Sequence, residues 1–161
     1  MSRSAPISSL NVAQSYFLCA EELAQLPQGR LGVFAAQPIT FLVTHGWELS
    51  LKAFLRASGM SERALAGKTF GHRLDNLLSE AERHGLSEHF QMSAEGDAVF
   101  DQITYAAERH EARYLNLDRP RIIDFNFKPL IDDGLRFYRA FVGEGDQCGR
   151  DWYSAEQQSI P

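Results

Sequence analysis

The feature that most constrains the fold is an apolar segment between residues 39 and 58. When its residues are placed about 100° apart, apolar and small side chains cover most of the circumference of a helix. Such a helix is stable only when other elements surround it, so we expect it to be central in the fold. One narrow polar stripe interrupts the apolar surface: His45, Glu48, Lys52 and Arg56.

The stripe has two interpretations. Glu48 stands four residues before Lys52, and this order stabilises an exposed helix by about 0.2–0.5 kcal/mol. An ion pair that supports the helix is therefore one interpretation, because structural ion pairs resemble functional ones. His45 and Arg56 add two groups that can bind ligands, so a binding site is the other interpretation.

Helical periodicity continues on both sides of this segment. The apolar spacing predicts main helices over residues 11–26, 71–84, 93–113 and 129–142, and a short helical turn over 61–67. Asn11 and Ser93 are the expected N-caps, and Gly59 is the expected left-handed C-cap of the central helix. No alternating strand pattern occurs, and residues 121–127 are expected to be a loop that buries apolar side chains. These patterns predict an all-α, up-and-down bundle of four to five main helices.

The pattern also predicts the core and the limits of the domain. We expect six residues to be largely buried: Leu49, Phe54, Leu78, Ile103, Leu135 and Tyr138. Residues 1–10 are expected to be a flexible N-terminus, residues 11–142 the helical domain and residues 143–161 a polar tail. A chain of 161 residues with 44% apolar residues can bury one core without disulfides or metal.

Composition excludes several classes of protein. The net charge of -5 argues against a protein that coats nucleic acid with its whole surface. The two cysteines have no spacing typical of a bridge or a zinc site, so we expect reduced thiols. The N-terminus lacks the apolar stretch of a signal peptide, and no segment is apolar enough to span a bilayer. We therefore expect a cytoplasmic protein that does not enter membranes.

His72 is a second candidate site residue because it follows Gly71 near the start of a predicted helix. Its ring can cap backbone N–H groups there, or it can reach back to the central helix. Facing Glu48, it would be an imidazole oriented by a carboxylate, which is an arrangement used in acid–base chemistry. We expect His72 to lie within hydrogen-bond or one-water reach of Glu48 or His45.

A basic concentration lies near the end of the predicted helix over 93–113: Arg109, His110, Arg113, Arg119 and Arg121. Together with the ring of Tyr114, these side chains can bind phosphates or stack on bases, although solvated helix ends have the same composition. The histidines show no metal-ligand spacing, and no phosphate loop or nucleophile motif occurs. We therefore expect neither a metal nor a cofactor.

Three short motifs resemble the HEPN domain superfamily of prokaryotic helical proteins. They are WELSLKAFL at residues 47–55, GHRL at residues 71–74 and ARY at residues 112–114. In that group a helix with an ExxLKAxL pattern is followed by a GHxL start to the next helix, and the resemblance covers residues 11–142. It implies a bundle of four or five helices, usually dimeric, in a toxin–antitoxin, antiviral or RNA-processing system.

Many HEPN proteins are metal-independent RNases that use an arginine and a histidine four to six residues apart near the start of a late helix. In this chain only Arg83 and His89 fit that spacing, and Gly85 separates them. The helix over 129–142 carries arginines but no histidine.

We therefore expect a non-catalytic, homodimeric module that binds RNA, a nucleotide or an antitoxin-like protein partner. One rival is an RNase toxin that uses Arg83 with His89, or His72 beside Arg73. Another is a purely structural interaction protein whose polar stripe is an internal network.

Overall fold

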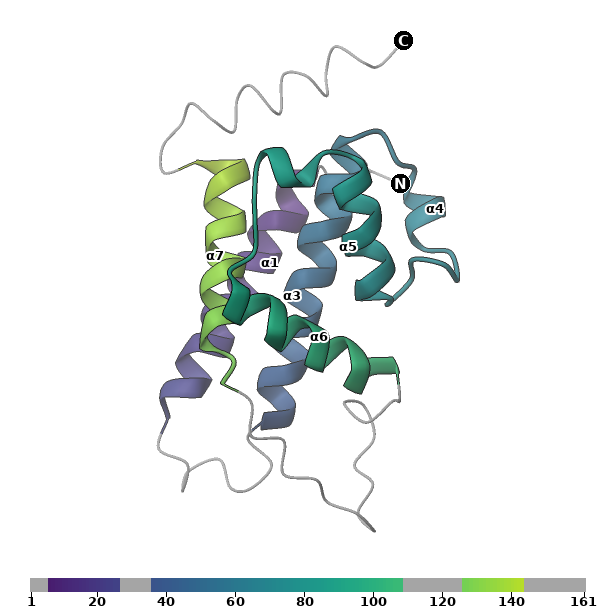
Figure 1. Cartoon of the computed structure of the whole chain (residues 1–161). Helices are drawn as coiled ribbons and strands as arrows, with labels where there is room; N and C mark the ends of the chain where they lie inside the picture. Colours follow the sequence, from purple (N-terminus) through teal and green to yellow (C-terminus); the bar gives the residue numbers. More distant parts are fainter. Residues whose placement is uncertain (1–5, 27–35, 109–125, 144–161) are drawn as a thin grey trace.

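The helices follow one another along the part of the chain that the structure describes. This computed structural model describes residues 6–26, 36–108 and 126–143 (Figure 1). In order, the elements are α1 (Pro6–Gln25), α3 (Ala36–Ala57), α4 (Glu62–Leu65), α5 (Leu74–Arg83), the 3-10 helix η1 (Leu86–Glu88), α6 (Ala94–Glu108) and α7 (Lys128–Val142). These described residues contain no β-strand, which confirms the predicted all-α class. None of the described helices is both long and apolar enough to cross a membrane.

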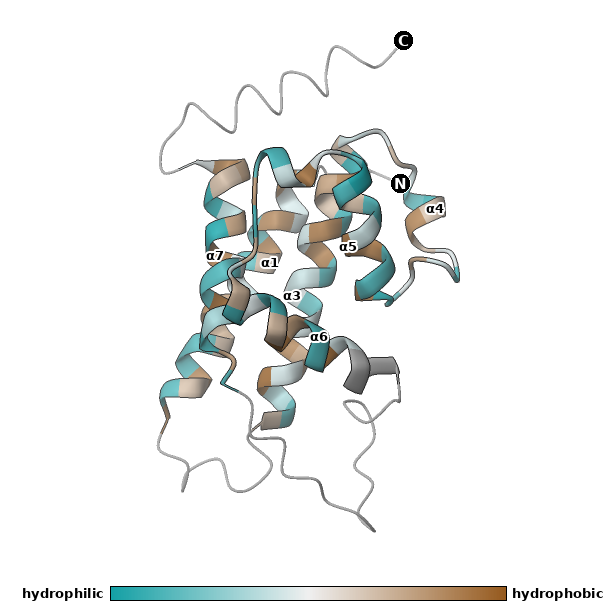
Figure 2. Ribbon diagram, viewed as in Figure 1, coloured by the Kyte–Doolittle hydropathy of each residue, from teal (hydrophilic) through white to brown (hydrophobic). Residues whose placement is uncertain are grey.

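Helix α3 occupies the centre of the bundle, as its apolar circumference predicts. It packs against α1, α5 and α7, while α6 crosses obliquely in front of it in Figure 1. Contacts between Trp47 and Leu130 and between Phe54 and Phe141 show that α3 and α7 run parallel. Helix α1 runs antiparallel to both and lies behind them in this view. Figure 2 shows hydrophobic and hydrophilic residues alternating along α5 and α7, as expected of helices with one buried face.

Trp47 on α3 is the centre of the core. Its side chain is fully buried, and its Nε1 atom donates a hydrogen bond of 3.2 Å to the carbonyl of Leu130. Four phenylalanine rings surround it with centroid distances of 5.7–6.0 Å: Phe17, Phe90, Phe100 and Phe137. The indole therefore ties α3 to α1, α6 and α7 and has its only polar group satisfied.

Two glycines allow α1 to approach its neighbours closely. The ring of Phe17 lies against Gly46 on α3 and against Gly134 on α7. A Cβ atom added at Gly46 would lie 2.8 Å from this ring, and one at Gly134 would lie 2.5 Å from it. Both distances are shorter than carbon atoms tolerate, so these helices can pack at this spacing only around glycine.

Two of the three predicted caps, Gly59 and Ser93, are present, whereas Asn11 lies inside α1. Gly59 has φ of 97° after the end of α3, and Met60 N–H donates to the Leu55 carbonyl at 2.9 Å while Gly59 N–H donates to Arg56 at 3.0 Å. This pair of bonds is the Schellman motif, which confirms the left-handed C-cap. Ser93 precedes α6, and its Oγ accepts from the Gly96 N–H at 3.0 Å, which confirms the N-cap.

Two predicted boundaries are wrong. Helix α1 begins at Pro6 rather than after Asn11, so residues 6–10 are helical; proline is well suited to a first turn because its missing N–H is not needed there. Helix α5 begins at Leu74 rather than Gly71, because turns occupy the preceding residues and the Gly71 N–H donates to Gly67 at 2.7 Å.

The predicted core is only partly right. Phe54 and Ile103 are buried, whereas Leu49, Leu78, Leu135 and Tyr138 are only half-buried and pack against the rim of the core. A periodic pattern defines a broad apolar arc but not its centre, and adjacent positions differ by about 100°. The apolar arc of α7 is centred on the buried Phe137, so Leu135 and Tyr138 lie toward its edges. Of the apolar residues expected in the loop over 121–127, Phe127 is buried, and Ile122 and Phe125 lie outside the described residues.

Candidate functional site

A buried carboxylate on α3 gathers basic side chains around it. Only 7% of the Glu48 side chain is exposed. Its Oε1 accepts a hydrogen bond of 2.7 Å from Lys52 Nζ, and its Oε2 lies 2.9 Å from Nδ1 of His72. His45 is on the same stripe, with Nδ1 at 3.8 Å from Oε2. The prediction that His72 lies within hydrogen-bond reach of Glu48 is confirmed.

Local structure places these groups for different reasons. His45, Glu48 and Lys52 meet because three or four residues separate neighbours on one face of a helix. His72 comes from the turn before α5, where the Arg73 N–H donates to the Phe70 carbonyl at 2.8 Å. The buried Leu74 follows directly and anchors this turn to the core. The imidazole is therefore presented to α3 by a turn that is held on both sides.

The surroundings of Glu48 keep it ionised. Burial of its carboxylate would by itself raise the pKa of Glu48. Hydrogen bonds from His45, His72 and Lys52, together with the positive charge of Lys52, outweigh burial and lower this pKa to about 2. Since the His45 nitrogen lies at 3.8 Å, beyond ordinary hydrogen-bond distance, we attribute most of the lowering to His72 and Lys52.

Ionisation of Glu48 determines the tautomer of His72. An ionised carboxylate can only accept hydrogen bonds, so Nδ1 of His72 must carry a proton to bond it at 2.9 Å. In the neutral ring the acceptor lone pair is then on Nε2. The His72 side chain is 64% exposed, so one end of the imidazole is held by Glu48 while much of the ring is in contact with solvent. This arrangement suits either ligand binding or proton transfer.

Aromatic rings line the other side of His45. The Phe41 ring stacks on the His45 imidazole with centroids 5.8 Å apart and an interplanar angle of 14°. Tyr16 of α1 meets the same imidazole edge-on at 4.8 Å. Phe41, in the second turn of α3, is 55% exposed, which is unusual for a phenylalanine. The stripe thus continues from charged groups into an exposed aromatic surface.

Two other sequence candidates, Arg83 and His89, contact different residues. Arg83 ends α5, is largely exposed and donates to Glu80 at 2.8 Å. His89 follows η1, and its ring packs 6.1 Å from the ring of Phe141. Gly85, with φ of 86°, separates the elements that carry Arg83 and His89. Arg56 lies one turn beyond Lys52 on α3. Four candidates lie outside the residues whose side chains are described: Arg109, Arg113, Tyr114 and Arg119.

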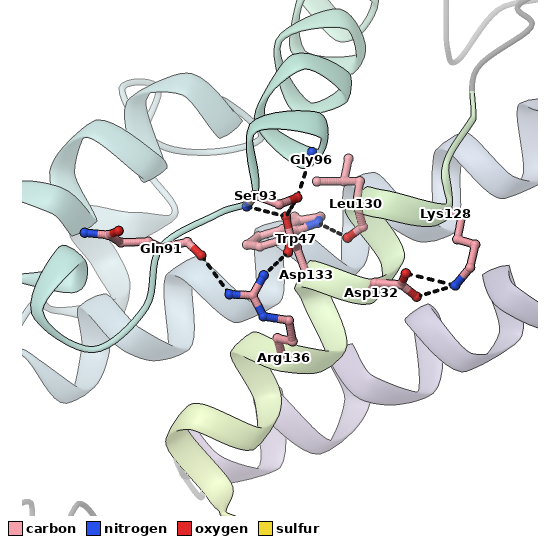
Figure 3. Close-up of polar contacts among 9 residues, drawn as sticks. All are labelled: Trp47, Gln91, Ser93, Gly96, Lys128, Leu130, Asp132, Asp133 and Arg136. Carbon is pink, nitrogen blue, oxygen red and sulfur yellow. Dashed lines mark hydrogen bonds and ion pairs between the residues drawn. The ribbon is translucent and has the colours of Figure 1, made fainter.

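A second buried polar network, not predicted from the sequence, joins α6 to α7 (Figure 3). Asp133 on α7 is 1% exposed and accepts from the Ser93 N–H at 2.8 Å and from the Ser93 hydroxyl at 2.7 Å. Arg136, three residues further on, also bonds Asp133 and donates to the carbonyl of Gln91 at 3.1 Å. The i, i+3 spacing of Asp133 and Arg136 was the available signal. The network attaches the start of α6 to α7, so we assign it a structural role.

Within residues 6–26, 36–108 and 126–143, no group of three or more histidine, cysteine, aspartate or glutamate side chains is arranged to hold a metal ion. Glu48 and its basic neighbours instead form a site suited to anions or to proton transfer. Comparisons with protein families, curated proteins and solved structures found no match to this chain.

Proposed function

We propose that the protein is a non-catalytic helical module of the HEPN type that binds RNA or a nucleotide along the exposed face of α3. The observation that carries this proposal is the ionised Glu48 surrounded by Lys52, His45 and His72. Glu48 balances the charge of Lys52, and the ring nitrogens of His45 and His72 add hydrogen-bonding groups beside this pair. Phosphate groups bind such clusters.

The aromatic end of the stripe supports the same ligand class. A base can stack on an exposed ring, and stacking does not depend on the identity of the base. Phe41 lies eleven residues before Lys52, which is about 16 Å along a helix. This separation matches two or three nucleotides of a single strand better than one mononucleotide. Short single-stranded RNA is therefore the preferred ligand within this proposal.

The binding test uses a fluorescently labelled single-stranded RNA and anisotropy at several salt concentrations, with a chelator present. We expect weak binding that falls steeply with salt, because phosphate contacts release counterions. Lys52→Gln and Phe41→Ala should each weaken binding several-fold, whereas Lys128→Gln, an exposed lysine on α7, should leave it unchanged. Equal RNA binding by all variants would show that the RNA does not bind at α3. Absence of both binding and cleavage would instead favour an antitoxin-like protein partner.

A metal-independent RNase remains the second candidate, and one observation favours it. The hydrogen bond between Glu48 and His72 orients an exposed imidazole, as a general base requires. Incubation of RNA with the protein in chelator tests this activity. Cleavage that His72→Ala abolishes, while Arg83→Ala and His89→Ala retain it, would place the chemistry at Glu48. Cleavage lost in both Arg83→Ala and His89→Ala would establish an RNase that uses Arg83 with His89. Intact RNA would support the non-catalytic module.

A further inference from the structure

His72 combines a ring nitrogen held by a buried carboxylate with a ring that is open to solvent. Its Nδ1 lies 3.1 Å and 2.9 Å from the two carboxylate oxygens of Glu48, and its side chain is 64% exposed. His45 shares the same carboxylate, but it is 32% exposed and its ring is flanked by Phe41 and Tyr16. His72 is therefore the imidazole of this site that an incoming molecule can reach, and Nε2 is the nitrogen that can react.

The other two histidines of the described residues lack this arrangement. His84 meets a carboxylate through the opposite nitrogen and at a longer distance, since its Nε2 lies 3.4 Å from Glu80. Glu80 also accepts a hydrogen bond from Arg83. His89 is exposed, and its ring contacts Phe141 rather than a carboxylate. His84 and His89 are therefore internal controls for any reaction of His72.

We propose that Nε2 of His72 accepts a phosphoryl group from a phosphoramidate, a donor that carries phosphorus on nitrogen. The Nε2 lone pair forms a bond to phosphorus, the P–N bond of the donor breaks, and the protonated donor nitrogen leaves as a neutral amine or ammonia with the bonding electrons. No proton leaves His72, because Nδ1 keeps its hydrogen and the ring becomes cationic. One P–N bond replaces another, so the transfer needs no further energy source.

Glu48 is suited to stabilise the phosphorylated ring. Its pKa is lowered to about 2, so the carboxylate is ionised when the ring becomes positive. The Nδ1–H group then donates a charge-assisted hydrogen bond, which is stronger than the bond from a neutral ring. The Glu48 side chain is almost fully buried, so water screens this interaction little. Glu48 is thus a positioning residue, because it contacts His72 and not the donor.

Lys52 favours a phosphoryl group over an uncharged reagent. Its Nζ and the Nδ1 of His72 both contact Oε1 of Glu48, at 2.7 Å and 3.1 Å. An ammonium group has three N–H donors, so Lys52 can keep its bond to Glu48 and donate another to a phosphoryl oxygen on Nε2. The negative charge of the phosphoryl group is attracted to this cation.

This activity does not depend on RNA binding, and its test contains no RNA, so the two proposals succeed or fail separately. The full chain is incubated with potassium phosphoramidate at about pH 8, where an ordinary imidazole is neutral. Peptide mapping by mass spectrometry without acid follows phosphorylation of each histidine. We expect His72 to react at least about tenfold faster than His84 and His89, because a hydrogen bond to an ionised group stabilises its product. NMR of the ring nitrogens should place the phosphoryl group on Nε2.

Glu48→Gln tests the role of the carboxylate. Glutamine keeps the size of the side chain but removes the charge, so phosphorylation of His72 should slow about tenfold. The amide can either accept from Nδ1 or donate to it, so the product should become a mixture of Nε2 and Nδ1 isomers. The rates at His84 and His89 in the same sample should not change. Glu82→Gln, at an exposed site on α5, should match the wild-type protein.

Circular dichroism of both variants verifies folding. Equal phosphorylation rates at His72, His84 and His89 in the wild-type protein would overturn the proposal. A wild-type product on Nδ1 of His72, or an unchanged rate and isomer in Glu48→Gln, would overturn it as well.

Discussion

The ion-pair cluster around Glu48 makes the stability of the protein depend on pH. The pKa of Glu48 is lowered from 4.5 to about 2 in the folded protein. Between these two values the unfolded chain binds a proton that the folded protein does not bind, so the free energy of unfolding rises with pH. The contribution of Glu48 is therefore complete above pH 4.5 or so and is lost as pH falls toward 2.

The magnitude follows from the same shift. The lowering of the Glu48 pKa from 4.5 to about 2 corresponds to about 3 kcal/mol of stability at neutral pH. Less than half of this contribution, about 1 kcal/mol, remains at pH 3 by the same relation. Because Glu48 is almost fully buried, solvent screening should not reduce this value much. Glu48→Gln keeps the size of the side chain but removes the charge, so it should abolish this pH dependence.

Urea denaturation of the wild-type protein, Glu48→Gln and the exposed control Glu82→Gln at pH 7, 5, 4 and 3 measures the effect. We expect Glu48→Gln to be less stable than wild type by about 2–3 kcal/mol at pH 7, with the difference shrinking by about 2 kcal/mol by pH 3. Glu82→Gln should follow the wild-type curve. A constant difference between Glu48→Gln and wild type across this range would refute the assigned interactions of Glu48.

Two further predictions concern packing and use the same denaturation assay. Gly134→Ala should destabilise the protein by about 1–3 kcal/mol, although alanine favours helices, because its Cβ would press on the Phe17 ring; Phe17→Leu in the same chain should recover part of the loss. A stabilised Gly134→Ala would show that the ring can move aside. Leu51→Ala should cost about 2–5 kcal/mol because Leu51 is fully buried, whereas the half-buried Leu49→Ala should cost clearly less. Equal losses would contradict the assigned orientation of α3.

Features within a single helix were accessible from the sequence. The all-α class, the central position of α3 and its left-handed end at Gly59 follow from periodicity and cap chemistry, which act over a few residues. The pairing of Glu48 with Lys52 belongs to the same category, since a helix brings residues four apart together whatever surrounds it. The predicted start of α1 was wrong because both Pro6 and Asn11 are locally suitable as the beginning of a helix.

Contacts between distant residues were decided by how the helices pack. His72 was a candidate from its place after Gly71, but its hydrogen bond to Glu48, 24 positions earlier in the chain, exists because the turn before α5 returns to α3. Asp133 could be paired with Arg136 from their i, i+3 spacing, but only the approach of α6 to α7 makes it the acceptor for Ser93. A sequence constrains local geometry through the backbone, whereas long-range neighbours depend on the joint packing of side chains from several helices. The contacts of Glu48 with His72 and of Asp133 with Ser93 could therefore be established only from the tertiary structure.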